Sequence, residues 1–383
     1  MRQVIADLSA SRIREVANAG LGREDVLAFW FGESDEVTPA GVRAAAQASI
    51  EAGETFYAHN LGLPALREAL AAYISSLHRP LGADRVAVTS SGVSALMLAQ
   101  QALVDAGDEV VAVVPVWPNL TAQPAILGAR VRRVSLHPRH GAWTLDLDEL
   151  LAAITPATRV LIVNAPNNPT GWTLQRAEIE AILAHCRRTG TWIVSDEVYE
   201  RLYFADGAVA APSFLDVAEP EDRLLVVHSF SKSFLMTGWR LGSLVAPVPM
   251  IEQLGKLIEF NTSCAPVFVQ RAGLAALAAA PQSVPALQAH LRCCRDTLVG
   301  ALQGLPRVEV ALPAGAMYAF LRVEGESDSL AFAKRLVHDQ GLGLAPGVAF
   351  GDEGQGWLRW CFASQHPQRL LQGVERLERA LKL

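Results

Sequence analysis

The chain has 383 residues, and at roughly 150 residues per domain this length allows two or three domains. Hydrophobic residues make up 51% of the chain, which is enough for full hydrophobic cores. The formal net charge of −6 and the lack of a lysine or arginine block exclude binding to nucleic acid or anionic membranes through basic patches. No apolar run reaches the roughly 18 residues that a membrane-spanning helix requires. We therefore expect a globular protein without nucleic-acid or membrane partners.

The five cysteines favour a reducing compartment, because their number is odd and no CxxC pair occurs among them. Cys293 and Cys294 are adjacent in a helical stretch, where they form neither an ordinary disulfide nor a zinc pair. The start of the chain is rich in charged side chains and lacks the apolar core of a signal peptide. We therefore predict a cytoplasmic protein and no metal site.

From residue 60 to residue 245, short apolar runs alternate with longer helical stretches. Helices are expected from Pro64 onward, from Ser91–Gly92 to residue 105, and over 178–189 before Gly190, since proline favours the first turn of a helix and glycine its end. Several of the runs are apolar on both faces, as in strands covered by helices on both sides. The alternation predicts the α/β class, with a large domain whose mostly parallel sheet is sandwiched by helices. The expected strands are 85–89, 109–114, 160–164, 191–195, 224–229 and 241–246.

After residue 280 the pattern changes to that of a small α+β domain. Two strands are expected within 305–323, and they are separated at 313–315. A helix over 329–340, a strand over 358–362 and an amphipathic helix from Pro367 follow. The alanine-rich stretch near residue 275 predicts a helix between the two domains.

Polar residues follow the expected strands of the large domain, and ligands of parallel sheets bind beyond the carboxyl ends of strands. Ser91, Gly92 and Val93 follow the first strand and open a helix, so their backbone N–H groups can face an anion, although a plain helix cap is the alternative. The loop NAPNNPTG, which contains Asn168, follows the third strand and is stiffened by two prolines.

The fourth and fifth strands are followed by ionisable side chains. Asp196 follows the fourth strand directly, and Tyr199 comes three residues later. Ser229 ends the fifth strand and is followed by Lys232 and then Arg240. Each of these residues alone has an ordinary structural explanation as a cap, a packing residue or a solvated charge. Their order along one sheet edge favours a site that combines an anion cradle with a lysine, an aspartate and a tyrosine.

These residues resemble the pyridoxal-phosphate (PLP) enzymes of the aspartate aminotransferase fold type I, class I and II. The resemblance spans residues 32 to 363 and is most specific around Lys232 and Arg240. The matching stretches are GESDEVTP (32–39), FYAHNLGLPALREAL (56–70), TSSGVSAL (89–96), NAPNNPTG (164–171), SDEVYERLYF (195–204), SFSKSFLMTGWRLG (229–242) and LRWCFA (358–363).

The resemblance implies roles in holding PLP and in catalysis. Lys232 would form the Schiff base with the cofactor and move a proton at the substrate α-carbon. Asp196 would pair with the pyridine nitrogen and keep it protonated. Tyr199 and Asn168 would hydrogen-bond the 3′ oxygen of the ring, and Trp117 would stack on it. The residues that would hold the phosphate are Ser91, Gly92, Val93, Ser229 and Arg240, with Ser231 as a further candidate.

The resemblance also implies how substrate and partner are bound. Arg359 would clamp the α-carboxylate of the substrate, helped by Asn168 and the backbone of Gly32. Tyr57 would reach the phosphate of a neighbouring subunit, which predicts a homodimer with shared active sites. Gly32 and Arg359 would lie together in the small domain. The expected division is a large PLP-binding domain over 41–280 and a small domain formed by 1–40 and 281–383.

The leading hypothesis is an aminotransferase that moves an amino group between an amino acid and a 2-oxo acid. Val93 stands where some relatives that act on acidic substrates carry a lysine, and no evident cation replaces it, so a dicarboxylate specialist is not expected. A PLP-dependent C–S β-lyase of the same fold uses the same residues and is an alternative. A non-catalytic regulatory protein on this fold is a second alternative. A nicotinamide-binding fold is disfavoured, because no GxGxxG follows the first strand.

Overall fold

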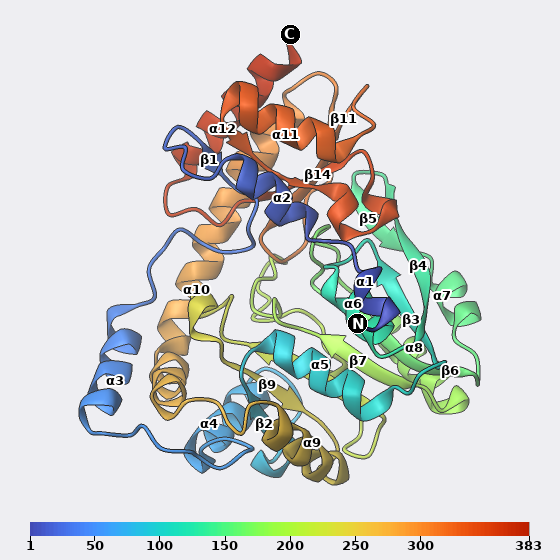
Figure 1. Cartoon of the computed structure of the whole chain (residues 1–383), viewed down its shortest axis with the longest axis vertical. Helices are drawn as coiled ribbons and strands as arrows, with labels where there is room; N and C mark the ends of the chain where they lie inside the picture. Colours follow the sequence, from blue (N-terminus) through green and yellow to red (C-terminus); the bar gives the residue numbers. More distant parts are fainter. Residues whose placement is uncertain (383) are drawn as a thin grey trace.

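The computed structural model describes residues 1–382 and contains a large and a small β-sheet joined by one long helix, α10 (Val267–Gln303) (Figure 1). The large sheet has eight strands in the order β2-β9-β8-β7-β6-β3-β4-β5. Only β9 and β5 run against the others, so the sheet is mostly parallel, as predicted. The strands are β2 (Val86–Thr89), β3 (Glu109–Val114), β4 (Arg130–Arg139), β5 (Ala142–Leu145), β6 (Thr158–Asn164), β7 (Trp192–Asp196), β8 (Leu224–Ser229) and β9 (Gly242–Val245).

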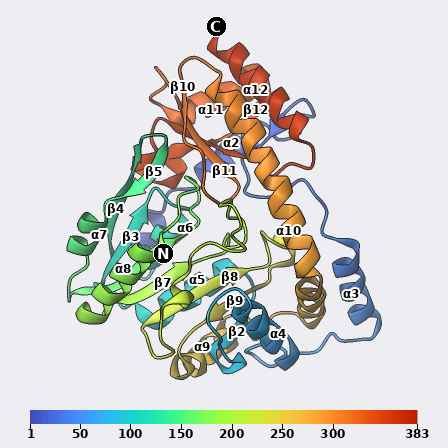
Figure 2. The same cartoon turned by 180° about the vertical axis from the view of Figure 1, so that it is seen from behind.

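Helices cover both faces of the large sheet, and β3 shows why. Val110, Ala112 and Val114 belong to one buried hydrophobic cluster, whereas Val111 and Val113 belong to the other. Successive side chains of a strand point to opposite faces, so an apolar strand needs a cover on both sides. One face packs against α5 (Gly92–Leu103), α6 (Asn119–Ile126) and α9 (Val248–Asn261). The other packs against α4 (Pro64–Ser75), α7 (Leu147–Ala153), α8 (Arg176–Thr189) and α10, most of which are seen from behind in Figure 2.

The predicted strands of this sheet are confirmed to within two residues at each end. The pair formed by β4 and β5 was not predicted. β4 has the sequence RVRRVSLHPR, and much of it is exposed near the edge of the sheet. Its arginines break the apolar pattern by which the buried strands are recognised.

The small sheet is antiparallel, has the order β10-β11-β14-β13, and confirms the predicted α+β character of the C-terminal part. Residues near the N-terminus lie in the same region, where β1 (Leu27–Ala28) pairs in parallel with β12 (Leu342–Gly343) as a separate two-stranded sheet. Other elements of this region are α1 (Gln3–Ala6), α2 (Arg12–Ala19), β10 (Val308–Val310), β11 (Tyr318–Val323), α11 (Ser329–Gln340), β13 (Ala345–Pro346), β14 (Trp357–Cys361) and α12 (Pro367–Leu381), while α3 (Ala40–Glu51) packs along α10.

The domain limits at residues 40 and 280 stay a prediction. Residue 280 lies inside α10, which runs unbroken from one sheet region to the other. Within residues 1–382, no helix combines the length and the apolar character that crossing a membrane requires. The carboxyl ends of β2, β6, β7 and β8 all lie at one edge of the large sheet, which faces the small sheet.

Candidate active site

A cavity of about 1010 Å³ lies at this edge of the large sheet. Its wall combines the ends of β6, β7 and β8 and the start of α5 with residues of β11 and β14 from the small sheet. The predicted site residues in the wall are Gly32, Gly92, Val93, Trp117, Asn168, Asp196, Tyr199, Ser229, Lys232, Arg240 and Arg359.

Lys232 follows β8 and extends into the cavity wall. Its Nζ donates a hydrogen bond of 2.6 Å to the carbonyl oxygen of Gly32, and it lies 5.6 Å from the ring centroid of Tyr199. Burial lowers the pKa of Lys232 to about 8, well below the ordinary lysine value. The amine is therefore suited to act as a nucleophile or a base near neutral pH.

Asp196 is the last residue of β7, and its side chain is buried. Burial raises the pKa of Asp196 to about 7. The amide side chain of Asn164 donates to the carbonyl of Asp196 over 3.0 Å, and the Asn164 side-chain oxygen accepts from the N–H of Asn168 over 2.8 Å. The first bond ties the ends of β6 and β7 together, and the N–H of Val198 donates to the carboxyl group of Asp196 over 3.4 Å. A bound cation would convert this carboxyl group to its charged form.

The start of α5 and two glycines form a place for an anion. A Cβ atom on Gly92 would lie 3.2 Å from Cβ of Ser229, and one on Gly242 would lie 2.6 Å from the backbone nitrogen of Gly92. Glycine is needed at Gly242, and Gly92 has little space for a side chain, because the strand ends and the helix start approach closely. The helix start offers backbone N–H groups without intrahelical partners, and Arg240 adds a guanidinium to the same wall.

Arg359 lies in β14, and its side chain is almost fully buried. Its Nη1 donates to Oδ1 of Asn168 over 3.0 Å, and its Nη2 donates to the carbonyl of Trp30. The guanidinium carbon lies 4.4 Å from the ring centroid of Tyr318 and 4.9 Å from that of Phe350. Among the described residues Nε has no hydrogen-bond partner. The guanidinium is thus fixed in place and retains a donor for a carboxylate.

Two predicted cofactor residues lie outside the cavity wall. Ser91 caps α5, since its hydroxyl oxygen accepts from the N–H of Ser94 over 3.1 Å. Tyr57 lies in the loop before α4 and is 89% exposed in the single chain. Their contacts to the phosphate stay predictions.

The structure adds residues that the motifs did not mark. Tyr318 lies in the wall with its hydroxyl 2.7 Å from that of Tyr199. Arg12 and Arg14, at the start of α2, also line the cavity. The expectation that no cation takes the place of Val93 stays a prediction, because both arginines come from α2 and Arg12 is paired with Glu15 over 2.8 Å. These residues lie far from the motifs in sequence, so only the packing of distant segments brings them into the wall.

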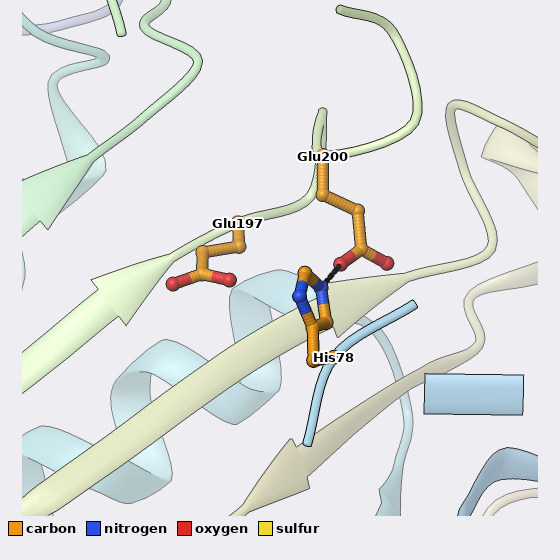
Figure 3. A group of neighbouring side chains, drawn as sticks. All are labelled: His78, Glu197 and Glu200. Carbon is orange, nitrogen blue, oxygen red and sulfur yellow. Dashed lines mark hydrogen bonds and ion pairs between the residues drawn. The ribbon is translucent and has the colours of Figure 1, made fainter. Parts of the chain in front are cut away.

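A second cluster of ionisable side chains lies behind the strand ends (Figure 3). His78, Glu197 and Glu200 bring metal-ligating atoms within 4.8 Å of one another. His78 Nε2 lies 3.1 Å from Glu200, and Nδ1 lies 2.8 Å from Asp216. Burial acts to lower the pKa of His78, but the bonds to Asp216 and Glu200 outweigh it and raise the pKa to about 10. The imidazole is therefore protonated near neutral pH, and we interpret the cluster as an ion-pair network.

Comparison with known proteins extends these observations to a family. A family model described as aminotransferase class I and II matches residues 28–377. The aspartate aminotransferase of Pyrococcus horikoshii is 31% identical over 379 residues, which cover 98% of this chain and 95% of that protein. The arginine–pyruvate transaminase of Pseudomonas aeruginosa is 34% identical over 342 residues, which cover 88% of this chain and 85% of that protein.

Comparison with a solved structure shows that the similarity extends to the fold. A single mutant of the aspartate aminotransferase from Thermus thermophilus superposes with a TM-score of 0.91 at 30% identity, covering 99% of each chain. The range matched by the family model includes every motif between residues 32 and 363. It leaves out only the N-terminal part of the cavity wall, which contains Arg12 and Arg14.

Proposed function

Since the chain belongs to the class I and II aminotransferases and is a PLP-dependent enzyme of that family, we propose that its cavity exchanges an amino group between an amino acid and a 2-oxo acid. The observation that carries the proposal is the presence of Lys232, Asp196 and Arg359 in the wall of one cavity. A nucleophilic amine, a buried carboxyl and a fixed guanidinium are the groups that this reaction needs.

The residues present fit a cofactor with a phosphate group and a protonated pyridine nitrogen. Gly92 and Gly242 let the strand ends approach the start of α5, where backbone N–H groups can hold the phosphate, and Arg240 supplies a positive charge in the same wall. Asp196 supplies the carboxylate for the ring nitrogen, and Trp117 lies in the wall as a surface for the ring. Bound there, PLP accepts the amino group and withdraws electrons from the substrate α-carbon.

Side chains of the cavity wall would bind the substrate, orient it and transfer protons. Arg359 binds the substrate α-carboxylate and so orients the α-carbon, and Lys232 removes and returns the proton on that carbon. Asp196 holds the proton on the ring nitrogen, and Tyr199 donates a hydrogen bond to the 3′ oxygen. The rigid contacts of Arg359 with Asn168 and two aromatic rings support this assignment.

The relatives do not agree on a substrate. One is named for aspartate and another for arginine and pyruvate. We therefore propose the substrate class, an amino acid with a free α-carboxylate, and leave the side chain open. A panel of amino donors tested against two oxo acids would identify the preferred pair.

A half-reaction distinguishes transfer from the β-lyase alternative. Purified enzyme loaded with PLP is mixed with an amino donor and no oxo acid, and the cofactor spectrum is followed. Amino transfer predicts stoichiometric conversion of the cofactor to its amino form. Sustained release of ammonia and pyruvate, for example from cysteine, would instead support elimination. The matched control is Lys232→Ala, which should show neither result.

We further propose that two copies assemble into a homodimer in which Tyr57 completes the site of the partner. Phe56, Tyr57 and Phe260 are 84%, 89% and 90% exposed. The N–H of Ala58 bonds to Sγ of Cys264, which brings the two exposed segments together. Exposed aromatic side chains that gather in one place are typical of a contact surface.

A cytoplasmic location is part of the same proposal. All five cysteines are free in the structure. Free thiols persist in reducing compartments.

A further inference from the structure

Tyr318 is the first residue of β11, and it contacts three of the groups assigned above. It is fully buried, and its hydroxyl is 2.7 Å from the hydroxyl of Tyr199. The two rings meet edge to face, with an interplanar angle of 80°. Its ring also faces the guanidinium of Arg359. Tyr318 therefore lies between the predicted cofactor-binding and substrate-binding residues.

Only one direction of the hydrogen bond between the two hydroxyls leaves Tyr199 a proton for the cofactor. Each hydroxyl carries a single proton, and burial raises the pKa of Tyr199 and of Tyr318 above the ordinary range, so both stay protonated. Among the described residues, Tyr318 Oη has no hydrogen-bond partner other than Tyr199. If Tyr199 donated to Tyr318, no proton would remain for the 3′ oxygen of the cofactor. Tyr318 as donor leaves Tyr199 free to donate, and a chain of such bonds strengthens its members.

The ring of Tyr318 contacts Arg359, the residue that we propose to bind the substrate. Arg359 lies on the strand paired with β11, and its guanidinium is placed between Tyr318 and Phe350. A desolvated cation–π contact fixes a guanidinium without using its N–H donors. The N–H donors of Arg359 therefore remain directed to Asn168 and Trp30, while Nε has no partner among the described residues.

Gly32 accommodates the same side chain. A Cβ atom on Gly32 would lie 2.1 Å from Oη of Tyr318, closer than any real contact. The carbonyl of Gly32 also accepts the hydrogen bond from Lys232. Glycine at this position is thus required by the tyrosine hydroxyl, and the hydroxyl is in turn held beside the lysine.

We propose that Tyr318 is a positioning residue with two separable parts. Its hydroxyl donates to Tyr199 and directs the proton of Tyr199 to the 3′ oxygen of the cofactor, while its ring holds Arg359 ready for the substrate carboxylate. This inference rests on the proposed function, because both effects concern bound cofactor and substrate.

The hydroxyl is tested with Tyr318→Phe, which keeps the ring. Without the hydroxyl of Tyr318, Tyr199 becomes a weaker hydrogen-bond donor to the 3′ oxygen, so this oxygen carries more negative charge. That charge raises the proton affinity of the Lys232 nitrogen that is bonded to the cofactor. The pH midpoint of the absorbance change that reports this proton should rise by about half to one pH unit. The control is Tyr73→Phe, because Tyr73 also bonds through its hydroxyl and stacks on an arginine, Arg201, but lies outside the cavity wall.

The ring is tested with Tyr318→Leu and a substrate analogue that binds at the cofactor but cannot lose an α-proton. The probe is 2-methylaspartate or 2-methylalanine, which have the α-carboxylate but no α-hydrogen, and the readout is the dissociation constant from the cofactor spectrum. Tyr318→Leu should weaken binding about tenfold. Tyr318→Phe should bind as the wild type does. Thermal unfolding of both variants verifies that they are folded.

The outcomes separate this inference from the proposed function. If wild-type protein with PLP does not convert its cofactor to the amino form with any amino donor, the proposed function fails. If the wild type shows the pH-dependent absorbance change and Tyr318→Phe has the same midpoint, the role of the hydroxyl is wrong. If Tyr318→Leu binds the 2-methyl amino acids as tightly as the wild type, the role of the ring is wrong.

Discussion

Burial acts in opposite directions on the two ionisable groups that face the cavity from neighbouring strand ends. It raises the pKa of Asp196 to about 7 and lowers that of Lys232 to about 8. Both shifts favour the neutral forms, which limits the cost of isolated buried charges. A cationic ring nitrogen at Asp196 would restore the charge of the carboxylate, which makes binding of that cation favourable.

Asp196→Asn should therefore separate cofactor binding from turnover. The amide has the shape of the carboxyl group but cannot hold the ring nitrogen in its protonated form. We expect PLP to remain bound and kcat to fall on the order of 100-fold or more, the usual cost of losing a key electrostatic group. Rates are measured with saturating PLP, and bound cofactor is measured by absorbance. Near-normal turnover would contradict the role given to Asp196.

Arg359→Lys should raise KM for all amino donors by a similar factor, because they share the α-carboxylate. Lysine keeps the charge but lacks the fork that bonds Asn168 and a carboxylate together. We expect an increase of about tenfold to 100-fold. The control is Arg369→Lys, since Arg369 also stacks on a ring, that of Phe29, but lies outside the cavity wall. An effect limited to acidic donors would place Arg359 at the substrate side chain instead.

At the scale of elements, the ion-pair network supports the strand ends from behind. His78 follows α4, Glu200 follows β7, and Asp216 ends the short 3-10 helix Phe214–Asp216. His228 of β8 lies 3.3 Å from the second oxygen of Glu200. The network thus joins four segments beneath the strands that end in Asp196 and Ser229. Breaking a buried pair leaves an uncompensated charge, so each member matters to stability.

The stability that this network supplies should depend on pH. The folded-state pKa of His78, about 10, lies above the unfolded value of about 6.5. Its contribution is therefore complete below pH 6.5 and is lost as the pH rises through 10. We expect His78→Gln to cost about 3 kcal/mol of unfolding free energy at pH 6 and progressively less at high pH.

Urea unfolding of wild type and variant at pH 6, 8 and 10.5 measures this difference. His185→Gln is the control, because His185 contacts a backbone carbonyl, that of Ile154, and no carboxylate. A His78→Gln difference that does not change with pH would contradict the ion-pair interpretation.

The elements whose bounds were predicted correctly from the sequence are those with one clear signal, such as a terminal glycine or an uninterrupted apolar run. α11 and β8 have the predicted bounds, since the helix ends at a glycine in the left-handed conformation, Gly341, and the strand is apolar throughout. β4 escaped prediction because its exposed face carries arginines. The full length of α10 also escaped, because Pro281 and Pro285 lie inside it. Helices tolerate such residues only when tertiary packing compensates for the lost hydrogen bonds.

At the scale of the molecule, the site draws on segments from nearly the whole chain. The strand-end residues could be predicted because parallel strands bring their carboxyl ends to one edge. Tyr318 and Arg14 could not, because they enter the wall through the packing of the small sheet and the N-terminal segment. No local pattern distinguishes them from other buried or exposed residues.

Shared active sites predict complementation between two inactive variants. Tyr57→Ala should weaken PLP binding and Lys232→Ala should abolish amino transfer. When the two are unfolded together and refolded, random pairing gives mixed dimers with one intact site, so about a quarter of all sites should be active. Activity is compared with that of each variant refolded alone. No gain on mixing, with dimers present by sedimentation, would contradict shared sites.

Two prolines lie inside α10, the helix that connects the large and small sheets. Pro281 and Pro285 supply no N–H to the carbonyls one turn earlier, at Leu277 and Pro281, so the helix is least stiff there. The part from Pro285 to Gln303 is about 27 Å long, and a turn of about 10° at the prolines would move its far end by about 5 Å. That end packs against β10 and β11, beside the strand of Arg359. A bend at these prolines would therefore shift the strand of Arg359 relative to the segment of Lys232.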